Sequence, residues 1–343
     1  MDTDALLATL REGTLPRDSA LALTAQELTA RNASGNTPLH AAAKYGRLRD
    51  LSTAVLTPEL LSIKNDSGYT PIHHLAYGGH FHQLPADFLS RAHFLIRSNS
   101  GYTPLHTAAA GGQLSQLPST AGPLDKDLFL LRTDLGNTLV HEAAEYGTLD
   151  RLPASILTAA ILSERNLSGE TVIHVAALNG HLDQIPPPLL GTGALLLTTK
   201  AGDTVLHAAA ISGHLHQLPP EVLVHDHLIL KSKTGYTPIH AAAETGQLNR
   251  IPPERLTIDL LLTRNDHGDT PLHAAAHEGH LDQIPAELLT AELMETRNYE
   301  GVTPLVSAIR RGHTDQLPPA LRPHPPGPFA RVLNKLGFSR SPF

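Results

Sequence analysis

Histidine is the residue type whose number and spacing in this chain could support chemistry. The 343-residue sequence contains 22 His and no Cys. Imidazole nitrogens bind transition metals and act as general acids and bases. Eight histidines recur at intervals of 33 or 35 residues, at His40, His73, His106, His141, His174, His207, His240 and His273. In a stacked array, equivalent residues lie about 10 Å apart, too far to share one ion at bond lengths of about 2 Å. We therefore interpret this series as structural.

The remaining histidines give no stronger signal for a metal or a catalytic centre. A second periodic series comprises His80, His181, His214, His280 and His313. The segment from His277 to His280 is one residue too short for the HExxH zinc motif, so its two His would not share a helical face. No phosphate-binding loop, dinucleotide fingerprint or nucleophile elbow is present. The sequence predicts no cofactor, no metal and no enzymatic activity; a His-rich metal-binding or hydrolytic protein is the alternative.

Two phase-locked series of glycines dominate the sequence. The first recurs at intervals of 33, with one interval of 35, and the second follows it by 11 residues each time. Nine such units cannot arise by chance, so they predict a repeat architecture. The first series is Gly35, Gly68, Gly101, Gly136, Gly169, Gly202, Gly235, Gly268 and Gly301, and the second runs from Gly46 to Gly312.

Each unit begins with a segment that predicts a short helix. Examples are TPLHAAAKYG from Thr37, TPIHAAAETG from Thr237 and TPLHAAAHEG from Thr270. Threonine is a good N-cap, and proline at the first helical position sacrifices no hydrogen bond. Alanine is the best helix former, and the closing glycine suits a left-handed C-terminal cap. Turn-rich segments such as KNDSG and RNDHG indicate hairpin-like loops between units.

The period of 33 with the Thr-Pro-Leu-His box and both glycines resembles the ankyrin repeat family, from about residue 32 to 318. The resemblance implies an all-α solenoid of about nine 33-residue helix–turn–helix units with loop tips, a concave groove and degenerate end caps. It also implies that the boxed histidines form hydrogen bonds where loop and helix meet. Such arrays contain contacts only between neighbouring units and need polar caps.

The second half of each unit departs from the family. A proline follows the second glycine by six residues in eight of nine units, as in Pro186, Pro252 and Pro285. Because proline disfavours helix in the preceding residue, we expect one short turn, a break, a short helix that starts at the proline, and a further turn capped by threonine. The predicted organisation is a degenerate capping unit at 1–34, an array at 35–320, and a Pro-rich linker with a basic tail at 321–343.

Composition limits the partners and the location of the protein. The formal charge is −7, whereas phosphate binding needs a basic face, so nucleic acid is not expected. No stretch approaches the roughly 20 apolar residues of a membrane span, and the N-terminus lacks the features of a signal peptide. We expect a monomeric cytoplasmic protein; delivery into another cell as an effector is the alternative.

Tyrosines and carboxylates mark the predicted partner-binding surface. The seven tyrosines fall either within two residues of the first glycine or near the end of the first helix, and tyrosine is favoured at protein interfaces. The alternative for the tyrosines after glycine is that they stack on adjacent loops and stiffen the array. Carboxylates at Glu142, Glu145, Glu170 and Asp203 occupy the same faces, either in an acidic groove or as solvated charges. The predicted partner-binding residues are Tyr45, Tyr69, Tyr77, Tyr102, Tyr146, Tyr236, Glu244, Asp269 and Glu278.

These features predict a non-catalytic scaffold or adaptor that binds a protein partner through the groove and the loop tips. A preformed groove reduces the ordering entropy that association costs. Two alternatives stay open, namely a regulator that masks a partner enzyme and an inert structural spacer. The tail carries Arg331, Lys335 and Arg340 among apolar residues, and is either a frayed end or a docking peptide.

Overall fold

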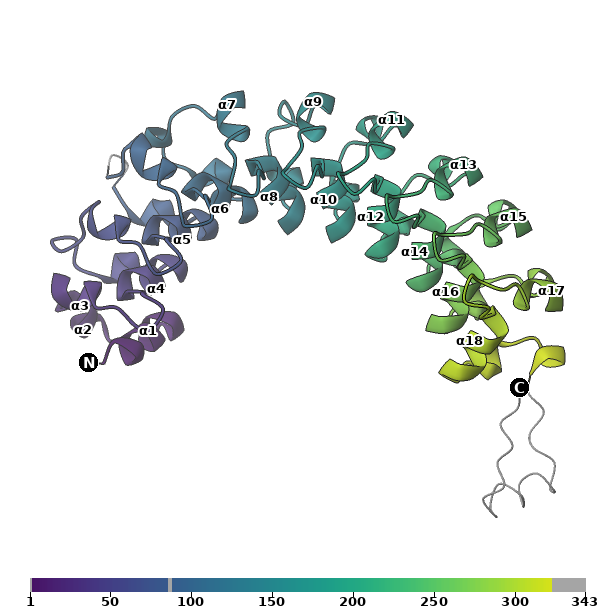
Figure 1. Cartoon of the computed structure of the whole chain (residues 1–343). Helices are drawn as coiled ribbons and strands as arrows, with labels where there is room; N and C mark the ends of the chain where they lie inside the picture. Colours follow the sequence, from purple (N-terminus) through teal and green to yellow (C-terminus); the bar gives the residue numbers. More distant parts are fainter. Residues whose placement is uncertain (1, 86–87, 323–343) are drawn as a thin grey trace, which may run out of the picture. The chain divides into compact units, whose positions relative to one another are not determined.

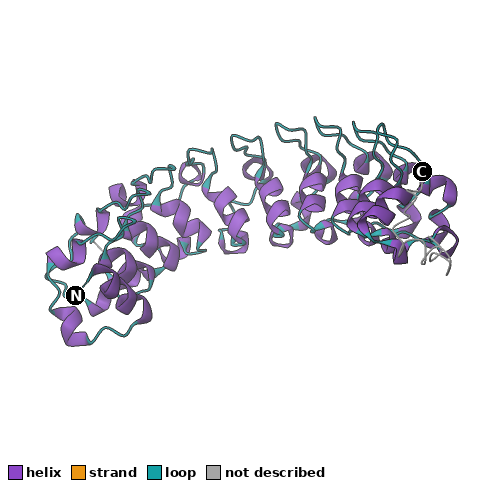
Figure 2. Ribbon diagram, turned by 60° about the horizontal axis from the view of Figure 1, so that its bottom comes forward, coloured by secondary structure: helices purple, strands orange, loops and turns teal. Residues whose placement is uncertain are grey.

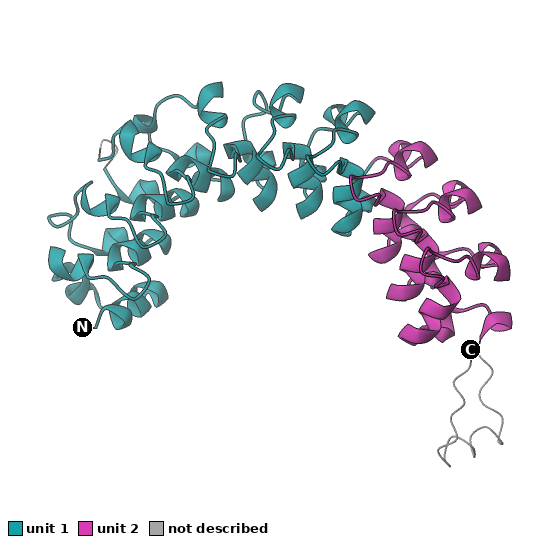
Figure 3. Cartoon of the chain, viewed as in Figure 1, with its two compact units in different colours: residues 1–218 teal, residues 219–343 magenta. Residues whose placement is uncertain are grey.

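A computed structural model describes residues 2–85 and 88–322 of the chain. The chain divides into two compact units, unit 1 at Met1–Leu218 and unit 2 at Pro219–Phe343 (Figure 3). Within the described ranges all regular elements are helical, apart from three isolated β-bridges between strand-like residue pairs. The prediction of an all-α helical repeat architecture is confirmed.

Each unit is built on a row of short helices, which we call the inner helices (Figure 1). Each inner helix packs against the next one within its unit. In unit 1 they are α1 (Thr3–Glu12), α4 (Pro38–Lys44), α5 (Pro71–Gly78), α6 (Pro104–Ala110), α8 (Leu139–Tyr146), α10 (Val172–Asn179) and α12 (Val205–Ile211). In unit 2 they are α14 (Pro238–Glu244), α16 (Pro271–Glu278) and α18 (Pro304–Arg311).

The ends of the inner helices follow from the residues predicted to form them. Thr70 is the extended N-cap of α5, and Pro71 is its first helical residue. Gly79 ends the helix in the left-handed conformation with φ of 67°, which costs glycine little because it lacks Cβ. Small side chains such as Ala42 and Ala43 are fully buried between neighbouring helices, so close approach of the helices explains the alanine runs.

The second half of each repeat forms an outer layer of single turns. The first turn is a 3₁₀ helix in each case: η1 (Leu48–Asp50), η3 (His80–Gln83), η5 (Leu114–Gln116), η7 (Leu149–Arg151), η8 (Leu182–Gln184), η10 (Leu215–Gln217), η12 (Leu248–Arg250), η14 (Leu281–Gln283) and η16 (Thr314–Gln316). Further 3₁₀ turns follow: η2 (Leu60–Ser62), η4 (Arg91–Leu95), η6 (Ser119–Ala121), η9 (Pro187–Leu189), η11 (Pro220–Val222), η13 (Pro253–Arg255), η15 (Ala286–Leu288) and η17 (Pro319–Leu321).

Short α-helices complete the outer layer. They are α2 (Arg17–Leu21), α3 (Ala25–Thr29), α7 (Lys126–Phe129), α9 (Ala159–Leu162), α11 (Thr192–Leu195), α13 (His225–Leu228), α15 (Ile258–Leu261) and α17 (Ala291–Met294). Thr290 caps α17, as predicted for the threonine of the LLT segment. The turn after the break differs in detail from the prediction, because Pro285 is an N-cap rather than a first helical residue and the turn that follows is 3₁₀.

The loops between inner helices lie side by side within each unit (Figure 2). Arginines at a fixed position of the repeat join successive loops. Arg132 Nη1 donates to Arg165 O at 2.7 Å, and Arg264 Nη1 donates to Arg297 O at 2.8 Å. These bonds join one loop to the next at the same place in successive repeats.

Candidate functional site

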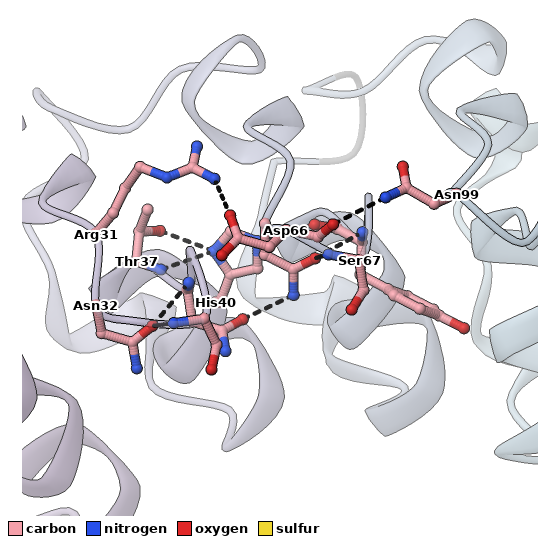
Figure 4. A network of polar contacts seen from close by, with 11 residues as sticks. Arg31, Asn32, Thr37, His40, Asp66, Ser67 and Asn99 are labelled. Carbon is pink, nitrogen blue, oxygen red and sulfur yellow. Dashed lines mark hydrogen bonds and ion pairs between the residues drawn. The ribbon is translucent and has the colours of Figure 1, made fainter.

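The boxed histidines join the helix of one repeat to the loop of the next repeat. His40 Nδ1 accepts from Thr37 N at 3.1 Å and contacts Thr37 Oγ1 at 2.9 Å, while His40 Nε2 lies 3.0 Å from Tyr69 O (Figure 4). A carbonyl can only accept, so the imidazole proton sits on Nε2. The same contact from Nε2 to a carbonyl recurs at His73, His106, His141, His174, His240 and His273.

Burial keeps these histidines neutral. Loss of hydration lowers the pKa of His40, His73, His106, His141 and His240 to about 4, because it disfavours the charged imidazolium. With both ring nitrogens of His40 occupied by protein groups, neither is open to a metal or a substrate. The prediction that the boxed histidines form structural hydrogen bonds where loop and helix meet is confirmed.

The loops that the boxed histidines anchor are also joined to one another. Arg31 Nη2 contacts Asp66 Oδ1 at 3.0 Å, and Asn99 Nδ2 donates to Asp66 O at 2.8 Å (Figure 4). Asn65 Nδ2 donates to Asn36 Oδ1 at 2.8 Å. Polar contacts thus hold the loop of one repeat to the loop of the next, which gives the loop tips a fixed spacing.

The second histidine series packs against glycines of the preceding repeat. A side-chain carbon added at Gly147 would lie 2.6 Å from His181 Cε1, and one added at Gly180 would lie 2.8 Å from His214 Cε1. Both glycines have positive φ, 69° and 77°. The close approach therefore requires glycine for both space and backbone conformation, and it assigns this series a packing role as well.

A recurring glutamine was not interpreted from the sequence, although its period is visible there. It follows the second glycine by four residues at Gln83, Gln116, Gln184, Gln217, Gln283 and Gln316. Gln184 Oε1 accepts from Leu149 N at 2.9 Å, and Gln184 Nε2 donates to Gly147 O at 2.9 Å. Gln217 makes the equivalent pair with Leu182 N and Gly180 O. One side chain thereby satisfies an orphan carbonyl at a helix end and an amide of the following turn.

Four of the predicted partner-binding residues meet in one open cavity of unit 2, which we call the acidic pocket. The cavity has a volume of about 360 Å³. Tyr236 and Asp269 come from successive loops, and Glu244 and Glu278 come from the ends of α14 and α16. The repeat period explains why these residues share a cavity, since residues about 33 apart occupy equivalent places in adjacent repeats.

The acidic pocket is negative and its donors are already ordered. Glu300 is a further carboxylate of its wall, and no Lys or Arg occurs among the described residues that line it. The Tyr236 hydroxyl donates to Glu244, and Asn298 Nδ2 donates to Asp269 Oδ1 at 2.7 Å. Burial and the neighbouring Glu244 raise the pKa of Tyr236, so its hydroxyl keeps its proton and remains a donor. The pocket can therefore accept hydrogen bonds and attract cationic groups.

Two other predicted tyrosines lie together in unit 1. The rings of Tyr69 and Tyr102 are 6.2 Å apart, and the Tyr69 ring lies 5.2 Å from that of His73. These contacts agree with the stacking alternative for tyrosines that follow glycine. Tyr146 and Tyr77 are 51% and 48% exposed at the ends of α8 and α5, so their rings are available to a partner.

Tyr45, the remaining predicted residue, lies in a separate cavity. That cavity has a volume of about 420 Å³ and is also lined by Asp4, Arg11 and Lys44. The Lys44 ammonium sits 5.6 Å from the centre of the Tyr45 ring. The predicted set therefore occupies three places, namely this cavity, the tyrosines of unit 1 and the acidic pocket of unit 2.

One carboxylate departs from both sequence interpretations. Glu142 is fully buried in α8, so it is neither a solvated surface charge nor a simple groove charge. Its position directly after the boxed histidine is alanine in several other repeats, such as Ala208 and Ala241, which are buried too. Comparison with the equivalent alanines of other repeats could therefore have indicated that a residue at this position is buried.

Two other features are absent from residues 2–85 and 88–322. No group of three His, Cys, Asp or Glu is placed to hold a metal ion there. No helix in these ranges is long and apolar enough to cross a membrane. The predicted basic tail falls almost entirely in 323–343, outside the described residues.

Comparison with known proteins agrees with the repeated geometry. The family model for three copies of the ankyrin repeat matches residues 255–317, and the model for a single ankyrin repeat matches residues 34–55. Comparison with curated proteins gave no match. These two segments are similar to ankyrin repeats, and the described helices agree with a helical repeat architecture of that kind. Ankyrin repeats are generally protein–protein interaction modules and are typically non-catalytic.

Proposed function

We propose that this protein is a non-catalytic scaffold or adaptor whose acidic pocket binds a basic patch of a protein partner. The observation that supports the proposal best is the wall of the pocket, where Glu244, Asp269, Glu278 and Glu300 surround Tyr236 without a Lys or Arg among the described lining residues. Opposite charge across an interface gives specificity and speeds encounter. Tyrosine adds a large contact area with few rotatable bonds.

The rigidity of the loops supports the same function. Hydrogen bonds such as that from Asn298 to Asp269 and that from His240 to Asp269 O hold the pocket wall in place before any partner arrives. A surface that is ordered in advance loses less entropy on association. That the protein acts as a monomer in the cytoplasm is part of the proposal.

Neutralising the pocket is expected to abolish partner capture. The variant Glu244→Gln, Asp269→Asn, Glu278→Gln keeps side-chain size and removes three negative charges. Truncating one partner of a hydrogen-bonded charge pair that the complex buries costs about 2–5 kcal/mol, so we expect the captured partner to be depleted at least ten-fold. Affinity capture with quantitative mass spectrometry, at low and at raised ionic strength, measures this depletion.

The matched control removes the same number of charges from the outer turns of unit 2. Glu254, Glu287 and Glu292 are exposed there, and their replacement by glutamine changes the net charge equally. Capture that falls in the control as much as in the pocket variant would show that net charge rather than the pocket governs binding. Capture that is unchanged in the pocket variant would contradict the proposed function.

A further inference from the structure

Three arginines of unit 1 line one open cavity near the start of the chain, which we call the arginine cavity. The cavity has a volume of about 440 Å³. Gly13 caps the end of α1, Arg17 begins α2 and Arg49 lies on η1, so three elements meet there (Figure 1). The described residues that line the cavity are Gly13, Leu15, Arg17, Arg47, Arg49 and Asp50.

The chain does not compensate the positive charge of the arginine cavity. Arginine side chains remain charged in proteins, so Arg17, Arg47 and Arg49 contribute three positive charges. Asp50 is the one carboxylate among the described lining residues. No ion pair between described residues includes any of these four side chains. Three arginines and one aspartate leave an excess of two positive charges, although the whole chain has a formal charge of −7.

Arg47 is held in place by packing rather than by polar partners within the chain. Gly13 has a φ of 71°, and a side-chain carbon added there would collide with Arg47 Nη2, so the guanidinium lies directly on the backbone of Gly13. Its buried Nε has no hydrogen-bond partner, and such a donor in a native structure calls for an explanation. The Arg47 side chain as a whole is partly exposed and lines the cavity, so a ligand in the cavity reaches its terminal nitrogens.

A role in the fold alone does not explain this arrangement. A structural arginine at this place would pair with Asp50 or bond a carbonyl at the end of α1, where a cation is favoured. The Arg47 guanidinium forms no ion pair with Asp50 among the described residues. The backbone amide of Gly13 already bonds Thr9 O at the end of α1, so the helix end is capped without Arg47.

We infer that the arginine cavity binds the phosphoryl group of a phosphorylated serine or threonine in a partner protein, with the phosphoryl oxygens on the guanidinium groups of Arg17, Arg47 and Arg49. This inference goes beyond the proposed function, because it concerns a second surface, in the other unit and of opposite charge. A phosphoryl group carries a charge of about −1.5 to −2 at pH 7 and three strong acceptor oxygens, which matches the excess charge of the cavity. Arginine binds phosphate oxygens in pairs through its planar fork of donors.

One phosphoryl group fits the cavity better than a carboxylate or a nucleic acid. A carboxylate carries one negative charge and two oxygens, so it uses fewer of the donors that three guanidinium groups offer. A nucleic acid needs a basic stripe or face, whereas these arginines surround a single cavity. The net charge of −7 also repels a long polyanion.

The test uses the full-length protein and the peptide acetyl-Gly-Gly-X-Gly-Gly-amide with phosphoserine as X. Its dissociation constant comes from ³¹P NMR titration, and the competitors are the serine peptide, the glutamate peptide, inorganic phosphate and oligothymidylate. We expect saturable binding of the phosphoserine peptide, no displacement by the serine peptide, and at least ten-fold weaker binding of the glutamate peptide and of inorganic phosphate. No saturable binding would overturn the inference. Equal binding of glutamate peptide or inorganic phosphate, or tighter binding of oligothymidylate, would overturn the choice of a phosphorylated residue.

Variants locate the contact within the cavity. We expect R47Q to weaken binding of the phosphoserine peptide at least ten-fold, because it removes a charged donor pair. Arg250→Gln removes an exposed arginine from η12 of unit 2 and is expected to change binding less than two-fold. Should R47Q fail to fold by circular dichroism, Arg17→Gln combined with Arg49→Gln tests the same cavity, because both side chains are exposed.

The two proposals fail separately. Loss of partner capture on neutralising the acidic pocket, together with no binding of the phosphoserine peptide, would leave the proposed function standing and overturn the phosphoryl assignment. An R47Q variant that is folded and binds the phosphoserine peptide as the wild type does would also overturn it.

Discussion

Replacing His174 by alanine is expected to lower the free energy of unfolding by about 3–5 kcal/mol, because it leaves several buried polar groups unpaired. His174 is fully buried. Its Nδ1 accepts from Thr171 N at 3.3 Å and contacts Thr171 Oγ1 at 2.8 Å, and its Nε2 lies 3.1 Å from Asp203 O. Alanine would remove all three contacts, open a cavity and release the loop at Asp203 from α10.

Urea unfolding followed by circular dichroism at 222 nm measures the effect. The control is His216→Ala, because His216 lies in the same unit on an exposed 3₁₀ turn; exposed substitutions of this kind usually change stability by less than about 0.5 kcal/mol. A loss below about 1 kcal/mol in His174→Ala, similar to the control, would show that the boxed histidine does not hold loop and helix together.

Acidification is expected to unfold the protein between pH 6.5 and about 4. The boxed histidines have pKa values lowered by burial, to about 4 for His40, His73, His106, His141 and His240, whereas the unfolded chain titrates near 6.5. In this window the unfolded chain binds more protons than the folded one, so stability is full above pH 6.5 and falls as pH decreases. Each pKa unit corresponds to about 1.4 kcal/mol, so several histidines together exceed a typical stability of about 5–15 kcal/mol.

Glu142 contributes with the opposite sign but cannot compensate. Its folded pKa is raised to about 7, so the stability linked to its protonation is present at acid pH and is lost as pH rises toward 7. One such group is outweighed by five histidines. Thermal unfolding recorded at half-unit pH steps tests the balance, and a melting temperature that stays constant from pH 6.5 to 4.5 would contradict the assignment of neutral, buried histidines.

Much of the fold could be predicted from local sequence, because each repeat uses the same residue types to start and end its helix. Threonine before proline starts each boxed helix, and glycine at positive φ ends it, as at Thr70 and Gly79. The proline after the second glycine correctly indicated a broken outer layer. The sequence did not show that Pro285 would act as an N-cap of a 3₁₀ turn, since proline is typical of the first helical position.

The binding surface was less predictable, because it depends on contacts between neighbouring repeats. The period alone brought Tyr236 and Asp269 to one cavity. The burial of Glu142, in contrast, depends on how Tyr102 and the helices on either side of α8 cover it. Sequence interpretation treated this carboxylate as a surface charge, although the alanines at the equivalent place in other repeats indicated a covered position.

Hydrogen–deuterium exchange of the protein, free and in complex with the captured partner, tests the central claim most directly. The claim is that the acidic pocket of unit 2 is the surface that the partner covers. We expect slower exchange on binding in residues 232–246 and 265–279, with exchange unchanged in the outer turns at 253–261 and 286–294, because amides covered by a partner open less often. Slower exchange confined to the outer turns, with the loops of the pocket unchanged, would contradict the claim.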